Sequence, residues 1–467
     1  MKNLLFILFS FPISLLHSQV FDGAVGWGAN WTFPSNYEVY VVKNLNDSGA
    51  GSLRHGLESD IAQDARIIVF NGLSGLITAQ SSFKLMNSKP IYVAGQTSQH
   101  GVLLRGVRDK EFALVTTPGP NIPNGVIFRS IALAIGPGQL VNETVPHGGA
   151  GNPGSGDGSG NTSGDNLLLT RGTNMIFDHV SFMWSTDENM DCWGSNISHV
   201  TFQNILSAQG LEYATHAYAT DSASGSYFGT HSMGGLFGSG ADKLSFYNVV
   251  FAHNGQRNPQ IQPAENGEYE IVNALRYNMR SFGFVMSSSG GSNAKVNAIN
   301  HYDIAGANSS TQRYPLTIAG NSRLYVRNAI SWKRPDSSLP EWDAVGHPGS
   351  RENYYTTQAP TAWQSTDPYD FPLKGVPTIP HEILEANLTA PGGVGTIQRN
   401  AAEEYVINTI KNKNGTIINW PDEVGGYPTI PAGAIIADSD NDGIPDSLEP
   451  TWGNDTFGYI NSIMSRE

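Results

Sequence analysis

The sequence predicts a right-handed parallel β-helix, an all-β solenoid of stacked coils with short parallel strands and long loops. The first observation is a degenerate repeat, in which a polar residue and a short β-branched apolar strand recur about every 22 to 26 residues. The second is that 52 Gly and 26 Pro make up 78 of the 467 residues, so turns are frequent and long helices few. The third is the low charged fraction of 15%, which excludes a charge-rich coiled coil and a disordered acidic chain.

The repeat is readable at six places, and the steps between their polar residues are 26, 44, 25, 24 and 31 residues. One unit cannot bury its own apolar face, so the coils must stack and share a core through parallel sheets. Stacked asparagines are then expected to hydrogen-bond along the axis as a ladder. A β-sandwich is the alternative, but hairpin dipeptides are scarce between the units. The units are FDHVSF around Asp178, FQNILS around Asn204, FYNVVF around Asn248, IVNALRY around Asn273, KVNAIN around Asn297 and VRNAIS around Asn328.

The beginning of the chain predicts export. Residues 1–18 combine Lys2 with an apolar run from Leu4 to Leu16, which is typical of a secretory signal peptide cut near Ser18. The run is too short to span a bilayer, so we expect a soluble protein in the periplasm or the extracellular space. The solenoid is expected to follow over residues 19–337.

The last third of the chain differs in composition. Residues 338–437 lose the repeat and accumulate Trp and Pro, which indicates loops that wrap the solenoid. Within them, AAEEYVINTIKNK predicts a short amphipathic helix, with Asn400 and Glu403 in capping-box spacing. Residues 438–467 form an acidic tail. Cys192 is the only cysteine in the sequence, so no intramolecular disulfide can form.

The charge balance restricts the partners of the protein. With 27 basic and 41 acidic side chains, the formal net charge is −14, which disfavours nucleic acid and anionic membranes. An anionic substrate would require a local cationic site or a bridging cation. We expect no nucleic-acid partner, no membrane span and a monomer.

Several ordered segments resemble a known family. They are YVVKNLNDSGAGSLRHGLES, ARIIVFNGLSG and IYVAGQTS near the beginning of the chain, and NVVFAHNGQRNPQI further along. Together they are similar to secreted bacterial polysaccharide lyases of the pectate lyase type, in the branch that carries a calcium motif in the tail. The resemblance implies a calcium-dependent enzyme on a pectate lyase-like β-helix that cleaves an acidic, polygalacturonate-like polysaccharide by β-elimination.

Such an elimination removes the proton next to a carboxylate, and the negative charge that forms must spread into that carboxylate. A divalent cation stabilises this charge, and Ca²⁺ requires several hard oxygen ligands. By the resemblance, Asp165, Asp187 and Asp191 are the calcium ligands, and Glu188 could replace either of the last two. From the residues alone, an acidic loop that keeps the solenoid soluble remains an alternative.

By the same resemblance, Arg257 in NGQRNPQI is the general base. Arginine normally stays protonated, so this role requires an unusual environment and close contact with the substrate proton. From its chemistry alone, Arg257 would instead bind the carboxylates of the substrate, for which a guanidinium is well shaped. Either role places it in the substrate groove.

Two positions depart from the family pattern. The coil GTHSMGGLFG lacks a lysine, and Gln262 stands where a second arginine is typical. Both are cationic substrate contacts in the family, and His231 and His216 are candidate replacements beside Gln262. A non-catalytic glycan-binding or adhesin β-helix, or a glycoside hydrolase with a carboxylate pair on the same fold, therefore stays open. Asp178 and His179 also match a family dipeptide, for which we expect a hydrogen-bonding role at a coil turn.

The tail carries the most specific local motif, DSDNDGIPDSLE. Its spacing is the EF-hand ligand scheme, with Gly443 at the sharp turn and the carbonyl of Ile444 as a ligand. It is also similar to thrombospondin type 3 repeats. Helix-forming sequence is thin on both sides, so we expect a single calcium-stapled turn; an acidic linker is the alternative. The carboxylate ligands would be Asp438, Asp440, Asp442, Asp446 and Glu449.

Overall fold

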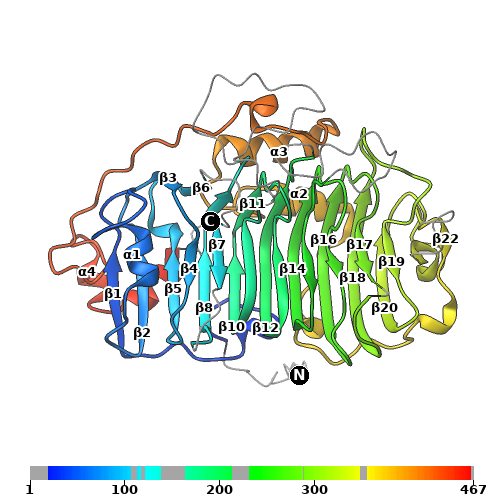
Figure 1. Cartoon of the computed structure of the whole chain (residues 1–467), viewed down its shortest axis with the longest axis horizontal. Helices are drawn as coiled ribbons and strands as arrows, with labels where there is room; N and C mark the ends of the chain where they lie inside the picture. The colour runs from blue at the N-terminus through cyan, green and yellow to red at the C-terminus, as the bar shows by residue number, and fades with distance from the viewer. Residues whose placement is uncertain are drawn as a thin grey trace, which may run out of the picture.

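The computed structural model describes residues 19–106, 113–116, 121–137, 164–212, 231–287, 289–347 and 355–463. The expected signal peptide, residues 1–18, and His216 lie outside these residues. Within them, no helix combines the length and the apolar character needed to cross a membrane. The strands stand side by side along one axis, in the order of the chain, which confirms the parallel β-helix (Figure 1).

Each coil contributes strands to three faces of the solenoid, and all pairings between coils are parallel. The first face contains β1 (Tyr37–Val41), β2 (Ala65–Val69), β5 (Ile91–Ala94), β8 (Asn124–Arg129), the central parts of β10 (Leu167–Asp178), β12 (Asp191–Ala208), β14 (Asp242–Ala252), β16 (Glu268–Tyr277) and β18 (Ala294–Ile304), and β20 (Ser322–Ile330). The second face contains β3 (Gly75–Ala79), β6 (Val102–Gly106), β9 (Ala132–Ala134), β11 (Ser181–Met183) and the last residues of β12, β14, β16 and β18.

The third face consists of short strands and is the one that positions the candidate site. It contains β4 (Phe83–Leu85), β7 (Leu114–Thr116), the first residues of β10 and β12, β13 (Leu236–Gly238), β15 (Gln260–Ile261), β17 (Phe284–Met286), β19 (Leu316–Ile318) and β21 (Val345–His347). β21 lies beyond residue 337, so the solenoid continues past the expected boundary. The short β22 (Thr357–Gln358) pairs antiparallel with β21 at this end.

Aromatic side chains stack along the axis inside the solenoid. Phe177, Phe202 and Phe246 occupy paired positions on neighbouring coils, and their ring centroids are 5.3 Å and 5.4 Å apart. All three are fully buried. Each such ring contributes about 1.5–3 kcal/mol through burial, and the repeated contact favours one register between coils.

The predicted asparagine ladder forms at the bend between the first and second faces. Asn204 donates to Asp178 Oδ1 (2.8 Å), Asn248 to Asn204 (3.0 Å), Asn273 to Asn248 (2.9 Å) and Asn300 to Asn273 (2.7 Å). The φ angles of these asparagines lie between 53° and 60°. Asparagine tolerates this left-handed conformation better than other residues with a side chain, which explains its recurrence at the bend. We call Asp178 and these four asparagines the outer ladder.

The prediction of one ladder residue, Asn297, was wrong. In KVNAIN the ladder residue is Asn300, whereas the amide of Asn297 donates to the carbonyl of Tyr369 (2.9 Å). Asn297 pairs with Tyr325 in the middle of the first face, away from the bend. Counted through Asn300, the steps to its neighbours Asn273 and Asn328 are 27 and 28 residues, more even than the 24 and 31 counted through Asn297.

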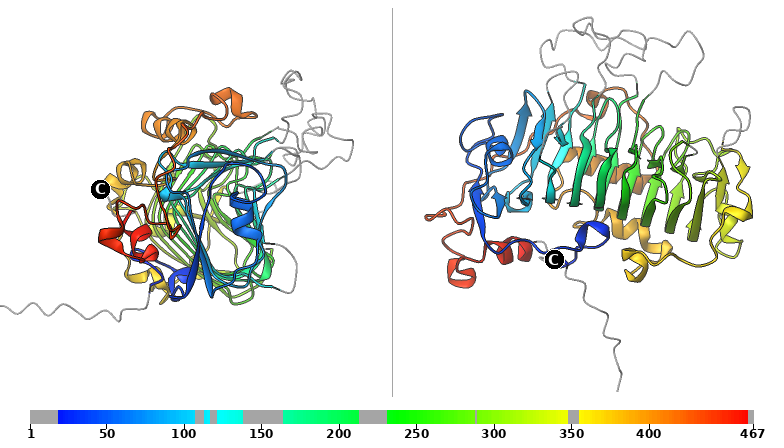
Figure 2. Two further views of the ribbon diagram at one scale, coloured as in Figure 1. Left: turned by 90° about the vertical axis from the view of Figure 1, so that its left-hand side faces the viewer. Right: turned by 60° about the horizontal axis from the view of Figure 1, so that its bottom comes forward.

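Helices cover the second face from outside (Figure 2). α3 (Ala401–Asn412) is the expected helix, and its capping box between Asn400 and Glu403 is present. α2 (His381–Thr389), which the sequence analysis did not anticipate, packs beside it. A third helix, α1 (Leu53–Glu58), buries Leu53 and Leu57 against the core near β4.

The tail folds back onto the beginning of the solenoid. Residues 413–437 run from α3 toward the N-terminal coils, and α4 (Glu449–Trp452) and α5 (Thr456–Ile463) lie beside them (Figure 1). Ile444 and Ile460 are buried with Phe21 and Phe33 against the outside of the first face. The first and last described segments of the chain therefore share one apolar cluster.

A buried carboxylate, Glu270, joins three segments on the outside of the first face. Ser245 Oγ donates to Glu270 Oε1 (2.6 Å) and accepts from Trp27 N (2.9 Å), while Leu373 N donates to Glu270 Oε2 (2.9 Å). Trp27 belongs to the N-terminal segment and Leu373 to the wrapping loops. Burial raises the pKa of Glu270 to about 7, although the hydrogen bonds from Ser245 and Leu373 oppose the shift.

We expect Glu270→Gln to remove a pH dependence of stability. The folded-state pKa of about 7 exceeds the unfolded one, so this contribution is complete below about pH 4.3 and is lost as pH rises through 7. Over that range, the wild-type protein should lose up to about 3 kcal/mol of unfolding free energy, measured by urea titration. Glu270→Gln should lack this slope, and Glu382→Gln, at a mostly exposed site, should keep it. Parallel pH profiles for the wild type and Glu270→Gln would contradict the assignment.

Candidate functional site

Six of the expected site residues lie in or beside one turn, just before the third face, on successive coils: Asp165, Asp187, Glu188, Asp191, His231 and Arg257. Asp165 precedes β10, Asp191 begins β12, and Arg257 precedes β15. Parallel bridges join Glu188 to Met233 and Met233 to Gln256, so the turns are aligned along the axis. Residues 92 positions apart in the sequence, Asp165 and Arg257, are brought together in this way.

Three carboxylates form a buried cluster at this turn. Asp165, Glu188 and Asp191 each offer an oxygen within 4.8 Å of the others, and their exposed fractions are 5%, 3% and 8%. Glu188 N also donates to Asp165 Oδ1 (2.9 Å). Asp187 is not a member of this group, although its charge acts on Asp165 and Asp191; its Oδ1 lies 3.0 Å from His231 Nδ1. Of the two neighbouring acids named from the sequence, Glu188 is therefore the one that joins Asp165 and Asp191.

The electrostatics of the cluster fit a hard cation. Burial, followed by repulsion from Asp191 and Asp187, raises the pKa of Asp165 well above its usual value, and Arg257 opposes the shift. Burial and the charge of Asp187 likewise raise the pKa of Asp191. Asp191 Oδ1 is buried and has no hydrogen-bond partner among the described residues. Three buried carboxylates with an unpartnered oxygen match the all-oxygen ligand set that Ca²⁺ prefers.

Arg257 lies beside this cluster. Its Nη1 contacts Glu188 Oε1, and its side chain is 27% exposed. The Nε atom is buried and unpaired within the described part of the chain. Burial lowers the pKa of the Arg257 guanidinium, whereas the charges of Asp187, Asp165 and Tyr355 oppose this. The residue combines access to solvent with an environment that weakens its hold on the proton.

No protein-family model matches the chain. Curated proteins described as probable pectate lyase C do match it over nearly its full length. The one from Aspergillus flavus is 29% identical over 454 residues, which cover 95% of this chain and 90% of that protein. The chain is similar to pectate lyases. The one from Aspergillus fumigatus is 28% identical over 461 residues, covering 97% of this chain and 92% of that protein.

These relatives confirm the expectation of an enzyme of the pectate lyase type. The resemblance read from the sequence was to a bacterial branch, whereas the curated relatives named here are fungal. Among solved structures, a pectate lyase from Paenibacillus sp. 0602 covers 84% of this chain and 99% of its own, with 12% identity and a TM-score of 0.45.

The expected substrate contacts of this pectate lyase-like chain are distributed unevenly. His231 lies at the acidic turn, paired with Asp187. Gln262 directly follows β15 and lies on the third face next to Gly238, whose register partner on the previous coil is Trp193. Trp193 lies two residues beyond Asp191 on β12 and is exposed (38%). The row of Trp193, Gly238 and Gln262 therefore runs beside the acidic cluster; the sequence analysis did not single out Trp193.

A second arginine at the site was also missed. Arg280 lies on the coil after Arg257, because Ser281 N donates to Gly255 O (2.9 Å). Its guanidinium pairs with the buried Glu212, and burial lowers the pKa of Arg280. The signal was available in the repeat: Arg280 follows Arg257 by 23 residues, about one coil length. A second guanidinium is thus present in the turn before the third face, one coil beyond Arg257, although Gln262 is neutral.

Asp178 and His179 have the structural role expected of them. Asp178 is fully buried; its Oδ2 pairs with Arg129 Nε (2.7 Å), and its Oδ1 contacts His179 Nδ1 (2.8 Å). Although burial alone would raise it, the pKa of Asp178 is lowered by the charges of His179 and Arg129. Arg129 also donates to Asn461 Oδ1 of α5 (2.9 Å). Asp178 therefore links the outer ladder to the tail.

The tail loop adopts a geometry suited to a cation. Asp438, Asp440 and Asp442 offer oxygens within 4.8 Å of one another. Asp438 Oδ1 and Asp442 Oδ2 lack hydrogen-bond partners among the described residues. Gly443 has a φ of 87°, which a residue with a side chain adopts only with strain. Asp446 is already engaged, because its Oδ1 accepts from Ser439 N (2.7 Å).

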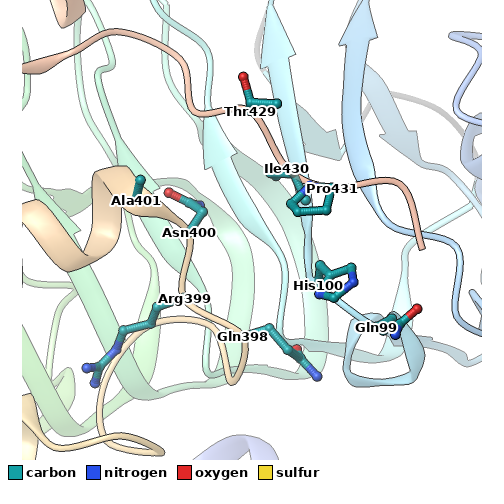
Figure 3. A pocket seen from close by; sticks show the side chains of 9 residues that line it. All are labelled: Gln99, His100, Gln398, Arg399, Asn400, Ala401, Thr429, Ile430 and Pro431. Atoms are coloured by element: carbon teal, nitrogen blue, oxygen red, sulfur yellow. The ribbon is translucent and has the colours of Figure 1, made fainter.

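A separate pocket of about 380 Å³ lies between the loop at His100 and the start of α3 (Figure 3). Two of its polar side chains are already used in holding the ends of helices. Arg399 donates to the carbonyls of Val394 and Ala390 at the end of α2, and Asn400 caps α3. The pocket contains none of the acidic cluster and does not contribute to the candidate site.

We expect Asp178→Ala to destabilise the fold by about 3–5 kcal/mol, because it leaves the buried charge of Arg129 unpaired. Urea-induced unfolding followed by far-ultraviolet circular dichroism measures the loss. Asp370→Ala removes an exposed ion pair with Lys374 and should change stability by at most about 1 kcal/mol. Equal losses of unfolding free energy in the two variants would show that the buried ion pair of Asp178 and Arg129 contributes no more to stability than an exposed one.

Proposed function

We propose that the protein is a secreted, calcium-dependent polysaccharide lyase that cleaves an acidic, polygalacturonate-like polysaccharide by β-elimination. The observation that carries the proposal is the meeting of Asp165, Glu188 and Asp191 with the guanidinium of Arg257 on aligned coils. The pectate lyase relatives support the reaction class. The expected signal peptide supports export.

The chemistry assigns different roles to the two kinds of group. Asp165, Glu188 and Asp191 would hold Ca²⁺, which supplies positive charge for the substrate carboxylate and for the charge that develops on it. The neutral form of Arg257 would take the proton from the carbon that bears this carboxylate. The electrons of that C–H bond form the C=C bond, the bond to the leaving sugar oxygen breaks, and this oxygen takes a proton from water. Burial lowers the pKa of Arg257, which is the direction that a proton acceptor requires.

Neighbouring residues would orient the polymer. Arg280 supplies a guanidinium for a second carboxylate, one coil beyond Arg257. Trp193 offers an exposed indole for the apolar face of a sugar ring, beside the neutral Gln262. His231 is placed to contact substrate at the acidic turn. The alternatives, a non-catalytic glycan-binding β-helix and a glycoside hydrolase, lack an observation of this kind in their favour.

The deciding experiment measures the unsaturated product, which absorbs in the near ultraviolet, over a panel of uronate polymers with and without calcium. Arg257→Lys keeps the charge but loses the planar fork, so elimination should fall at least about 100-fold while calcium-dependent polymer binding persists. Arg323→Lys, at an exposed arginine of β20, is the matched control and should retain full activity.

A second variant separates the metal from the base. Asp165→Ala combined with Asp191→Ala, two members of the acidic cluster, should abolish the calcium dependence of polymer binding itself. Full turnover of Arg257→Lys on the best substrate would make Arg257 a substrate clamp. Calcium-dependent binding without product from any polymer would favour the non-catalytic β-helix, and product without the unsaturated bond would favour a hydrolase.

We further propose that the tail loop binds Ca²⁺ through Asp438, Asp440, Asp442 and Glu449 and stabilises the fold without entering catalysis. Asp440→Ala with Asp442→Ala should lower the melting temperature in calcium by several degrees, since the loop lies against the N-terminal coils. The specific activity of the folded fraction should stay unchanged. Lost activity at an unchanged melting temperature would instead place the tail in the site.

A further inference from the structure

A second chain of asparagine amides runs inside the solenoid, beneath the candidate site. Asn166 donates to Asn189 Oδ1 (3.1 Å), Asn189 to Asn254 Oδ1 (3.4 Å) and Asn254 to Asn258 Oδ1 (3.1 Å). Asn258 then donates to the carbonyl of Phe282 (3.2 Å) on the coil of Arg280. We call these four asparagines the inner ladder. It extends from the coil of Asp165 to the coil of Arg280, which are also the limits of the candidate site.

The inner ladder is fully buried and well satisfied. None of its side chains is more than 1% exposed. The Oδ1 atoms of Asn166, Asn189 and Asn254 also accept hydrogen bonds, from Ile135 N (2.7 Å), Ser185 Oγ (2.8 Å) and Gly210 N (2.9 Å) respectively. Buried amides without partners would destabilise the fold, whereas a satisfied network fixes one arrangement of its neighbours.

Each of three site residues directly precedes an inner-ladder residue. Asp165 precedes Asn166, Glu188 precedes Asn189, and Arg257 precedes Asn258. The asparagine side chain lies in the interior of the coil stack, while the preceding side chain belongs to the site. An amide that is held at both ends therefore fixes the backbone from which the neighbouring functional group projects.

The hydrogen bond between Asn254 and Asn258 has a special place, because it closes the turn that contains Arg257. The coil before it leaves room for this turn through Gly234. A Cβ atom at Gly234 would lie 2.6 Å from both Arg257 O and Asn258 Oδ1. The position of Arg257 thus depends on close packing between an amide of the inner ladder and a glycine backbone.

We propose that the inner ladder is a positioning device for the proposed lyase reaction and rests on that function. Its hydrogen bonds set the distance between the carboxylates that would hold calcium and the guanidinium that would take the proton. Asn189 acts on the metal cluster through Glu188, and Asn258 acts on the base through Arg257. Neither residue touches substrate, so both are positioning residues.

The outer ladder provides a matched control. It contains the same residue type and the same kind of amide hydrogen bond, and its member Asn273 is as buried as Asn189. No residue of the acidic cluster and no site arginine directly precedes an asparagine of the outer ladder. Substitution of Asn273 therefore removes two ladder hydrogen bonds, as substitution of Asn189 does, but at a bend of the coil that carries no site residue.

The test compares Asn189→Ala, Asn258→Ala and Asn273→Ala in the full chain. Calcium binding is measured by calorimetry with Asp440→Ala and Asp442→Ala present, so that only the site on the solenoid contributes. Asn189→Ala should weaken calcium binding about 10- to 100-fold. Asn258→Ala should lower kcat about 10- to 100-fold and leave KM within about threefold. Asn273→Ala should lower the melting temperature by a similar amount but change neither quantity more than about twofold.

Two further measurements keep the outcome decisive. If an alanine variant does not fold, Asn189→Ser and Asn258→Ser retain a small polar group and should show the same pattern at smaller amplitude. Calcium affinity and kcat within twofold of the wild type in folded inner-ladder variants would overturn the proposal. If the wild type eliminates no uronate polymer, the proposed function fails, while a selective loss of calcium affinity in Asn189→Ala would still support positioning. A wild type without calcium binding would overturn both.

Discussion

Hydrogen bonding between successive parallel coils is the constraint on which the other features of this molecule depend. Coils stack at about 4.8 Å, and a shift by one residue would turn every inward side chain outward. The rings of Phe177, Phe202 and Phe246 and the outer ladder all favour one register. With the register fixed, residues that are far apart in the sequence become neighbours along the axis. The candidate site is a product of this alignment, not of any local motif.

The coverage of the faces explains why the site lies where it does. The second face is closed by α2 and α3, and the first face is partly closed by the N-terminal segment and the tail. Along the coils of the candidate site, the third face carries no helix among the described residues, because α1 lies near β4 at the beginning of the solenoid. The turn that leads into this face collects charged side chains from successive coils. Gathering Asp165, Glu188 and Asp191 in a buried place is unfavourable without a compensating positive charge. Arg257 supplies part of it, and a cation would supply the rest.

The sequence predicted the solenoid and the outer ladder because both repeat at the length of one coil. Within KVNAIN, Asn297 was predicted as the ladder residue instead of Asn300. Both are asparagines of one strand, and only the position of the bend, which the sequence does not show, decides which of them joins the ladder. The site residues were predicted from the family resemblance. The choice between Asp187 and Glu188 depends on where their side chains point, which the spacing of residues in the sequence does not show. The inner ladder escaped detection because its members lie in turns of unequal length. No side chain caps the N-terminus of α2, and the helix has only a weak apolar stripe. Its sequence therefore gave little indication of a helix.

The contact between Arg129 and Asn461 joins a strand of the first third of the chain to the final helix. A ribosome makes β8 long before it makes α5, and an exported chain crosses its membrane in the same order. The apolar cluster on the outside of the first face, which includes Phe21 and Phe33, therefore stays incompletely covered until α5 has emerged. A chain that lacks α5 would therefore display an apolar surface where this one carries a helix.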